Sequence, residues 1–310
     1  MTFRKNIILL AVVAFILSII FLFLQLNWQA FNFVMPRRVN RLLAILLSAG
    51  IIGFTSLIFQ TITNNRILTP TIIGLDSLYL LIQTFLVFTG LTIASQVNFF
   101  LSIGLMVLFS SVLFAILMKR AHNVLFILLV GMIFGTLFSS LSLFMQVLID
   151  PNEFAIIQNR MFASFTNMNQ NVLLSAFILS GISVIFSLKV FKYLDVLALG
   201  RETAVNLGVE YNKLVNRFLL LIAVLVAIST ALVGPVTFLG LLVANLAREL
   251  FKTYKHSYLL ISSSLLAMIV LLIGQILLEH VTGFRTPMNV LINFFGGGYF
   301  LFILLKEQQT

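Results

Sequence analysis

Ten apolar segments follow one another along the chain, each separated from the next by a short polar stretch. They cover residues 7–26, 42–60, 71–92, 98–118, 124–148, 171–190, 214–233, 236–250, 258–278 and 288–305. A helix needs about 20 apolar residues to cross the hydrocarbon core of a bilayer, with a range of about 17–25. The pattern therefore predicts an all-α fold: a polytopic transmembrane bundle of about ten helices, formed as a single domain over residues 1–310.

The seventh and eighth segments are separated by only Gly234 and Pro235. Proline is tolerated in the first turn of a helix, because the N–H that it lacks would have no intrahelical partner there. We therefore expect these two segments to form a tight helical hairpin.

The basic residues indicate how the bundle is oriented. If the N-terminus lies in the cytoplasm, most of the 19 basic residues fall on inner segments, as the positive-inside rule requires. This arrangement predicts that both termini are cytoplasmic. The exceptions on the outer side are Arg37, Arg38, Arg41, Arg160 and Arg285. Three of them crowd into one short outer loop, which calls for a specific explanation.

The composition excludes several classes of protein. Hydrophobic residues make up 61% of the chain and charged residues 9%, whereas soluble domains carry about 25% charged residues. The net charge is +10, but no run of Lys and Arg forms a basic tract, so nucleic acid is not an expected partner. The chain has no cysteine, no phosphate-binding loop and no metal-ligand spacing. We therefore expect no cofactor, no metal site and no enzymatic activity.

Arg38 and Arg41 stand just before the second apolar segment, on the outer side. Long cationic side chains often snorkel from a membrane helix to the interface. Alternatively, guanidinium groups match the planar geometry of carboxylates and could receive a partner protein. Both interpretations remain open from the sequence.

Asp76 follows Gly74 near the predicted inner start of the third segment. A carboxylate is stabilised at a helix N-terminus by the helix dipole, which favours a structural role. An ionisable residue inside a membrane segment is also a candidate for a substrate pathway or a gate.

Several glycines carry a packing signal. Gly131 and Gly135 lie one helical turn apart, and residues 296–298 are all glycine. Small residues let membrane helices approach closely, so close packing is the first expectation. A broken helix that lines a cavity is the alternative for 296–298. Gly200 and Gly208 bracket about two turns of polar sequence, which predicts a short helix with a glycine stop on the inner surface.

The motifs resemble those of the FecCD family, permease subunits of type II ABC importers for siderophores, haem and cobalamin. The resemblance extends from about residue 35 to residue 305. It is carried by four sets of positions in order along the chain: 38–43 with 47–50; Gln60, Asn65, Pro70 and Gly74; Leu199, Gly200, Ala204, Leu207, Gly208 and Val209; and Gly234, Phe238, Gly240, Leu241, Val243 and Arg248.

The chain also departs from the family pattern. Arg201 replaces the usual acid of the inner motif, and Gln275 and Glu279 replace the acid and the arginine of the ninth segment. Residues 76–79, 275–280 and 296–298 resemble the branch that imports catecholate siderophores.

The resemblance implies a mechanism and partners. An extracytoplasmic substrate-binding protein would deliver a ferric siderophore to the outer face of a multi-pass protein of the bacterial cytoplasmic membrane. Two separate ATP-binding subunits would drive transport, and a second permease would complete the channel, with a heterodimer favoured over a homodimer. Iron would travel already chelated, so the chain would need no metal ligands.

The same resemblance implies roles for individual residues. Docking of the binding protein would use Arg38 and Arg41, with Arg285 as a further docking point. Coupling to the ATPase would use Gly200, Glu202, Ala204, Leu207 and Gly208. Candidates for the pathway or a gate are Asp76, Gln275 and Glu279.

Two alternatives remain: a permease of the same family for haem or cobalamin, and an ion-coupled secondary transporter. The latter would need ionisable residues inside the membrane, of which Asp76 is the clearest. Copurification with an ATPase subunit would separate the importer from the ion-coupled carrier.

Overall fold

The computed structural model describes residues 2–26, 28–91, 93–120, 124–166, 168–283 and 286–307, and every regular element in these ranges is a helix. The main helices are α1 (Thr2–Phe23), α2 (Phe31–Ile62), α3 (Leu75–Phe88), α4 (Ser95–Arg120), α5 (Val124–Leu148), α7 (Gln170–Phe191), α10 (Tyr211–Val233), α11 (Leu239–Phe251), α12 (His256–His280) and α13 (Met288–Glu307). Each overlaps one predicted segment, so the expected number of about ten helices is confirmed. The expected outer loop with Arg37, Arg38 and Arg41 is wrong, because α2 begins at Phe31 rather than near residue 42 and these three residues lie in its first turns. Of the described helices, seven are long and apolar enough to cross a membrane.

Shorter helices connect these segments. They are η1 (Trp28–Ala30), η2 (Pro70–Ile73), α6 (Pro151–Met161), α8 (Leu194–Leu197) and α9 (Arg201–Asn206). Of these, only α9 corresponds to an element that the sequence predicted. The prediction missed α6, because a search for apolar segments of membrane length passes over a polar helix. Its sequence nevertheless contains helix signals, with Pro151 at the start, Glu153 in the first turn and Arg160 in the last.

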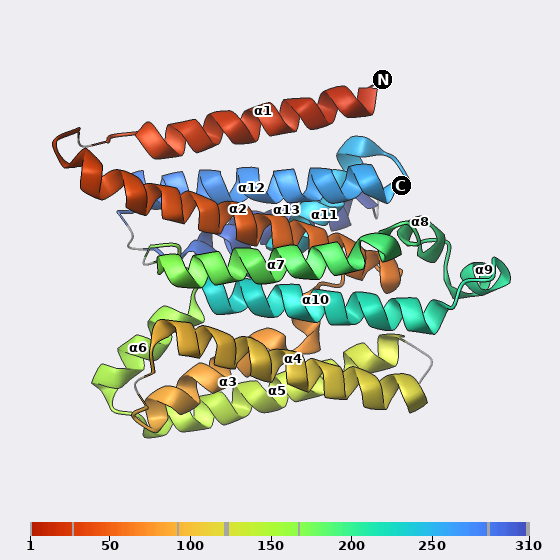
Figure 1. The fold of residues 1–310 in the computed structure, drawn as a ribbon, viewed down its shortest axis with the longest axis horizontal. Helices are drawn as coiled ribbons and strands as arrows, with labels where there is room; N and C mark the ends of the chain where they lie inside the picture. The colour runs from red at the N-terminus through yellow and green to blue at the C-terminus, as the bar shows by residue number, and fades with distance from the viewer. Residues whose placement is uncertain are drawn as a thin grey trace.

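The helices form one bundle whose two ends differ (Figure 1). Both chain termini lie at the end that carries α8 and α9, which we call the inner end, and α6 lies at the opposite, outer end. Helices α2 and α10 are the most buried of the long helices, whereas α1 lies at the edge and is mostly exposed. Helix α2 packs most extensively against α12, and α10 packs against α4, α2 and α7. The orientation of the bundle in the membrane stays a prediction from the charges.

The expected tight hairpin between the seventh and eighth segments is wrong. Helix α10 ends at Val233 and α11 begins only at Leu239, with non-helical chain between them. Helix α11 then packs mainly against α12 and α2. The connection is held by bonds to other parts of the chain, since Asn289 Nδ2 donates to the Pro235 carbonyl at 2.9 Å and Ser164 N donates to the Val233 carbonyl at 2.8 Å.

Glycines permit the closest helix contacts, as the sequence predicted for Gly131 and Gly135. A Cβ atom on Gly131 would lie 3.0 Å from Ile73 Cα, and one on Gly135 would lie 3.2 Å from Gly74 Cα. Helix α5 therefore packs directly on the backbone that leads into α3. The alternative of a broken helix at 296–298 is wrong, because α13 continues through these glycines.

Among the described glycines, the closest approach to the backbone of another helix joins α2 to α12. A Cβ atom on Gly53 would lie only 2.5 Å from the Ser263 carbonyl oxygen. Ser263 Oγ donates to the Gly53 carbonyl at 3.0 Å, and Ser264 Oγ donates to the Gly50 carbonyl at 3.2 Å. Serine hydroxyls thus use the space that the glycines leave, and they hold the two helices at one register.

We expect Gly53→Ala to destabilise the protein, because the added methyl group must push α2 away from the α12 backbone. Overpacking of this kind costs about 1–3 kcal/mol. The matched control is Gly181→Ala in α7, where a Cβ atom would have no neighbour within 4 Å. There the change should be neutral or stabilising, because alanine is the better helix former. Thermal unfolding midpoints in detergent test this, and equal midpoints for the two variants would contradict the packing argument.

Candidate functional site

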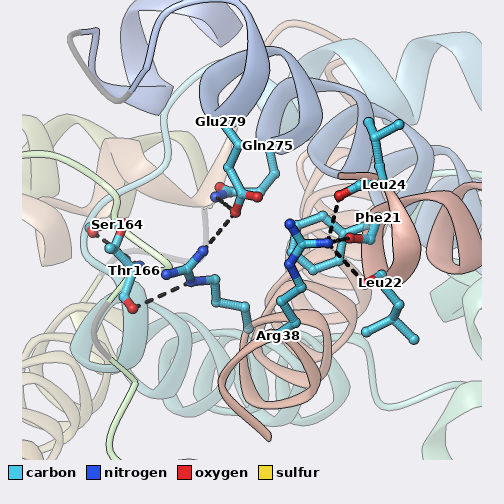
Figure 2. Close-up of polar contacts among 9 residues, drawn as sticks. Phe21, Leu22, Leu24, Arg38, Ser164, Thr166, Gln275 and Glu279 are labelled. Atoms are coloured by element: carbon cyan, nitrogen blue, oxygen red, sulfur yellow. Dashed lines mark hydrogen bonds and ion pairs between the residues drawn. The ribbon is translucent and has the colours of Figure 1, made fainter. Parts of the chain in front are cut away.

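The outer end of the bundle brings together several of the residues singled out in the sequence. Arg38 comes from the first part of α2 and is only 9% exposed. Its Nη1 atom donates to the carbonyl oxygens of Phe21, Leu22 and Leu24 at 3.2, 2.9 and 2.8 Å (Figure 2). Carbonyl groups at the end of a helix have no intrahelical partner, and a cation is favoured there. Arg38 therefore caps the C-terminus of α1, a role that neither interpretation of the sequence anticipated.

Arg41, which the sequence assigned to docking, lies beside residues that the sequence assigned to a pathway or a gate. Its Nη1 atom lies 2.7 Å from Glu279 Oε1 in a salt bridge, and its Nε donates to the Thr166 carbonyl at 3.4 Å. Gln275 Nε2 donates to the same Glu279 oxygen at 3.1 Å, and Figure 2 shows the two α12 side chains side by side. One expected docking residue thus pairs with an expected pathway residue, Glu279, which also accepts a hydrogen bond from a second one, Gln275. We call Arg41, Gln275 and Glu279 the outer cluster.

The outer cluster is largely removed from solvent. The side chains of Arg41 and Glu279 are 17% and 7% exposed, and Gln275 is 2% exposed. A buried carboxylate needs a paired charge, which Arg41 supplies from α2. Sequence reasoning noticed that Glu279 replaces the family's arginine, but it could not show that this acid faces Arg41.

The other outer arginines differ from Arg38 and Arg41. Arg37 is exposed, and its Cζ lies 3.8 Å from the centroid of the Phe33 ring, a cation–π geometry. Nothing in the sequence separates Arg37 from Arg38, because their difference depends on where α1 ends beside α2. Arg285 lies outside the described residues.

Arg160 belongs to a second polar site at the outer end, which sequence reasoning missed. Its Nη1 donates to Gln83 Oε1 at 2.7 Å, and Gln83 Nε2 donates to Asn98 Oδ1 and Ser102 Oγ, both at 3.0 Å. A cavity of about 230 Å³ adjoins this network. The polar residues of this network come from three different helices, α3, α4 and α6. No short sequence motif could therefore have predicted the network.

Asp76 lies in the first turn of α3, inside the bundle. Its Oδ1 accepts a hydrogen bond from Thr230 on α10 at 3.0 Å, whereas its Oδ2 is buried without a partner among the described residues. No side chain caps α3. A small cavity of about 30 Å³, lined in part by Thr71 and Ser229, adjoins the carboxyl group. The role of Asp76 in a pathway or a gate stays a prediction.

The inner end carries the short helix that the glycines predicted. Gly200 and Gly208 have φ of 89° and 79°, a backbone region that favours glycine, and they flank α9. Ala204 is the buried residue of α9, and Glu202 is exposed. Leu199, Val205 and Leu207 expose apolar side chains to the surroundings of the bundle. The segment is therefore a protruding helix with an apolar surface, which suits contact with another protein.

Among the described residues, histidines and acids do not gather into a metal-binding group. In the part of the chain that the structure describes, no group of three or more His, Asp or Glu residues could hold an ion. His256 pairs with Asp195, and His280 Nδ1 lies 3.1 Å from Gln25 Oε1. His122 lies outside the described residues.

Comparisons with known proteins identify the family of the chain. Residues 5–306 match the FecCD transport family. The chain is 51% identical to the petrobactin import system permease protein YclO of Bacillus subtilis, over 99% of each chain. It is 35% identical to the petrobactin import system permease protein FatC of Bacillus anthracis, over 89% of this chain and 79% of that one.

A solved structure supports the fold. It is described as an inward-facing conformation of a metal-chelate type ABC transporter, and it superposes with a TM-score of 0.86 at 24% identity, over 98% of this chain and 99% of that one. A second petrobactin import permease of B. subtilis, YclN, is 25% identical over 92% of this chain and 89% of its own. One organism thus has two related permeases named for the same import.

The geometry predicts that two adjacent arginines differ sharply. Arg38→Ala leaves three carbonyl groups at the end of α1 without their donor, and a lost hydrogen bond of this kind costs about 1–3 kcal/mol. Arg37→Ala removes an exposed cation–π contact worth about 0.5–1 kcal/mol. We therefore expect a clear fall in the unfolding midpoint for Arg38→Ala and a small one for Arg37→Ala. The reverse order would refute the capping role.

Proposed function

This chain belongs to the FecCD transport family, and we propose that it is a permease subunit of an ABC importer that carries a ferric siderophore across the bacterial cytoplasmic membrane. The observation that carries the proposal is the 51% identity to a petrobactin import permease over nearly the whole of both chains. We propose ferric petrobactin or a close chemical relative as the substrate. The catecholate branch suggested by the sequence stays a prediction, as does the alternative of haem or cobalamin.

The work of this chain is transport rather than catalysis. Its relatives are named as permease proteins of import systems. The helices give it the multi-pass form of a membrane protein. We propose that two separate subunits hydrolyse ATP and that α9, with its exposed Leu199, Val205 and Leu207, is the surface on which one of them docks. Apolar side chains at a protruding helix are suited to a groove in a partner.

We propose that the channel is formed with a second, different permease. The named pair YclO and YclN supports a heterodimer, since this chain is similar to both but much more to YclO. The cavity between the two permeases would hold a complete chelate, so neither subunit has to strip the iron of its ligands.

Docking of the binding protein is the role proposed for the outer arginines. Arg37 is exposed and offers its guanidinium directly. Arg41 is held by Glu279, so a carboxylate of the binding protein would have to share or replace that partner. Arg38 contributes indirectly, because it fixes the end of α1 beside the docking surface. Arg285 remains part of the proposal from the family resemblance.

The ion-coupled carrier has less support. Asp76 is the ionisable residue that such a carrier would need, but one of its oxygens is already bonded to Thr230. The full-length match to permeases of import systems favours the ATP-driven importer.

Reconstitution tests the proposed function. We expect liposomes that hold this chain, a YclN-like permease and the ATPase subunits to take up iron-labelled petrobactin when ATP and the binding protein are present. Omission of ATP or of the binding protein should abolish uptake. The purified chain alone should hydrolyse no ATP, because it lacks a phosphate-binding loop. Uptake driven by an ion gradient without ATP would favour the carrier instead.

The docking role is tested by the affinity of the binding protein and its dependence on salt. Arg37→Ala and Arg41→Ala should both weaken docking and flatten the salt dependence, because such charges steer association. An exposed pair is worth about 0–1 kcal/mol and a desolvated one about 2–5 kcal/mol, so the loss should be larger for Arg41. Lys213→Ala controls for the loss of one positive charge, since Lys213 pairs with Glu210 at the exposed inner end.

The decisive version of this test is charge reversal. Arg41→Glu should abolish docking, and a Glu→Arg change on the binding protein should restore part of it. If affinity and salt dependence are unchanged in both alanine variants, these arginines do not receive the binding protein.

A further inference from the structure

A contact at the inner end ties the proposed ATPase-coupling segment to a distant helix. Asp195 in α8 lies six residues before Arg201, the first residue of α9. The Asp195 Oδ1 atom accepts a hydrogen bond from the His256 backbone N–H at 2.9 Å, and the same oxygen lies 2.6 Å from His256 Nδ1. Lys255, the residue before α12, makes no side-chain cap. Asp195 therefore caps α12 from another part of the chain, where a negative charge also suits the helix dipole.

His256 extends this contact to α2. Its Nε2 lies 2.9 Å from Thr61 Oγ1, and the imidazole is largely buried, with its side chain 7% exposed. Arg248 of α11 approaches the same threonine, with Nη2 3.5 Å from Oγ1. The inner ends of α2, α11 and α12 thus meet around one histidine.

Both flanks of α9 are anchored at this place. On one side, Leu194 and Leu197 of α8 are fully buried, and α8 packs against α2. On the other side, the Tyr211 hydroxyl donates to the Ile62 carbonyl at the end of α2, at 3.4 Å. Helix α9 itself protrudes. A displacement of α9 by a partner therefore has a route to the inner ends of α2 and α12 through α8 and through Tyr211, in addition to the direct contact of α9 with α10.

Helices α2 and α12 are also fastened to each other along their length. At the middle, Ser263 and Ser264 bond to the carbonyls of Gly53 and Gly50, and the backbones touch at Gly53. At the outer end, Arg41 of α2 holds Glu279 of α12 at 2.7 Å. Contacts at the inner end, the middle and the outer end oppose both sliding and separation of the pair, since packed helices do not deform continuously.

We propose that α2 and α12 move as one body, and that Asp195 and His256 are the positioning residues through which a movement of α9 reaches that body. The outer cluster, and with it the face proposed for the binding protein, is the far end of the same body. This inference rests on the proposed ATP-driven importer, and it assigns the transmission step to two residues outside the docking and pathway sets.

The first test separates transmission from assembly. We expect Asp195→Ala to assemble with the other subunits and keep basal ATP hydrolysis, but to lose most stimulation by loaded binding protein and about tenfold in uptake, within the range typical of coupling between sites. Asp195→Asn keeps an oxygen for the His256 N–H but loses the charge, so it should fall between Asp195→Ala and the parent. Glu210→Ala is the matched control, because Glu210 is an acid at the same end whose pair with Lys213 is exposed. Stimulation and uptake equal to the parent in both Asp195 variants would overturn the proposal.

The second test examines the single-body claim. The chain has no native cysteine, and Ser264 Oγ lies 3.2 Å from the Gly50 carbonyl. Gly50→Cys with Ser264→Cys can therefore be bridged by a short, reducible bifunctional thiol reagent that links α2 and α12. Uptake should be the same with the link closed or reduced. Loss of uptake that returns on reduction would show that the two helices must move apart. If the parent complex takes up no siderophore at all, the proposed function is wrong. If the parent complex is active, the variants test the coupling proposal alone, because their uptake and ATPase stimulation are compared with those of the parent.

Discussion

A charged or polar group inside a membrane bundle must find its partner within the chain, because the surrounding lipid offers none. This constraint explains the main polar contacts of the structure. Arg38 donates hydrogen bonds to the carbonyls at the end of α1, Arg41 and Glu279 form a salt bridge, and Asp76 accepts a hydrogen bond from Thr230. In each case the partner comes from a different helix. The few polar groups therefore decide which helices stay together, while the many apolar side chains provide contact area without much selectivity.

The apolar pattern was sufficient to locate the ten main helices, because membrane thickness imposes a length that can be counted along the chain. Local chemistry was also readable, as with the glycines on either side of α9. The path of the chain between α10 and α11 could not be predicted from the sequence, since it depends on hydrogen bonds to distant residues, such as the one from Asn289 to Pro235. The same is true of the arginines. Arg37, Arg38 and Arg41 look alike in sequence, yet their environments are set by the end of α1, by α12 and by the residues near Thr166.

In the proposed mechanism, displacement passes between the two ends of the permease through the joint movement of α2 and α12. It does not depend on many small shifts spread over the whole bundle. These helices combine the closest backbone contact near Gly53 with polar contacts at both ends. An importer must coordinate events on opposite sides of a membrane, and a stiff pair of helices can transmit displacement over that distance with little loss. Helices α1, α4 and α7 have a smaller share of buried residues than α2 and α12.

The cap on α1 has a consequence for how the chain is made. Until α2 has been synthesised, the last carbonyls of α1 have only water and lipid head groups to bond, so the first helix enters the membrane unfinished. Arg38 completes it from seventeen residues downstream of Phe21. The first two helices should therefore be released laterally into the bilayer as a pair, and an arginine on the outer side can be tolerated during insertion because it is withdrawn into a helix end. The positive-inside rule counts every arginine equally. Arg38 is bound to the carbonyls at the end of α1 and therefore should not be counted as an ordinary loop charge when topology is assigned.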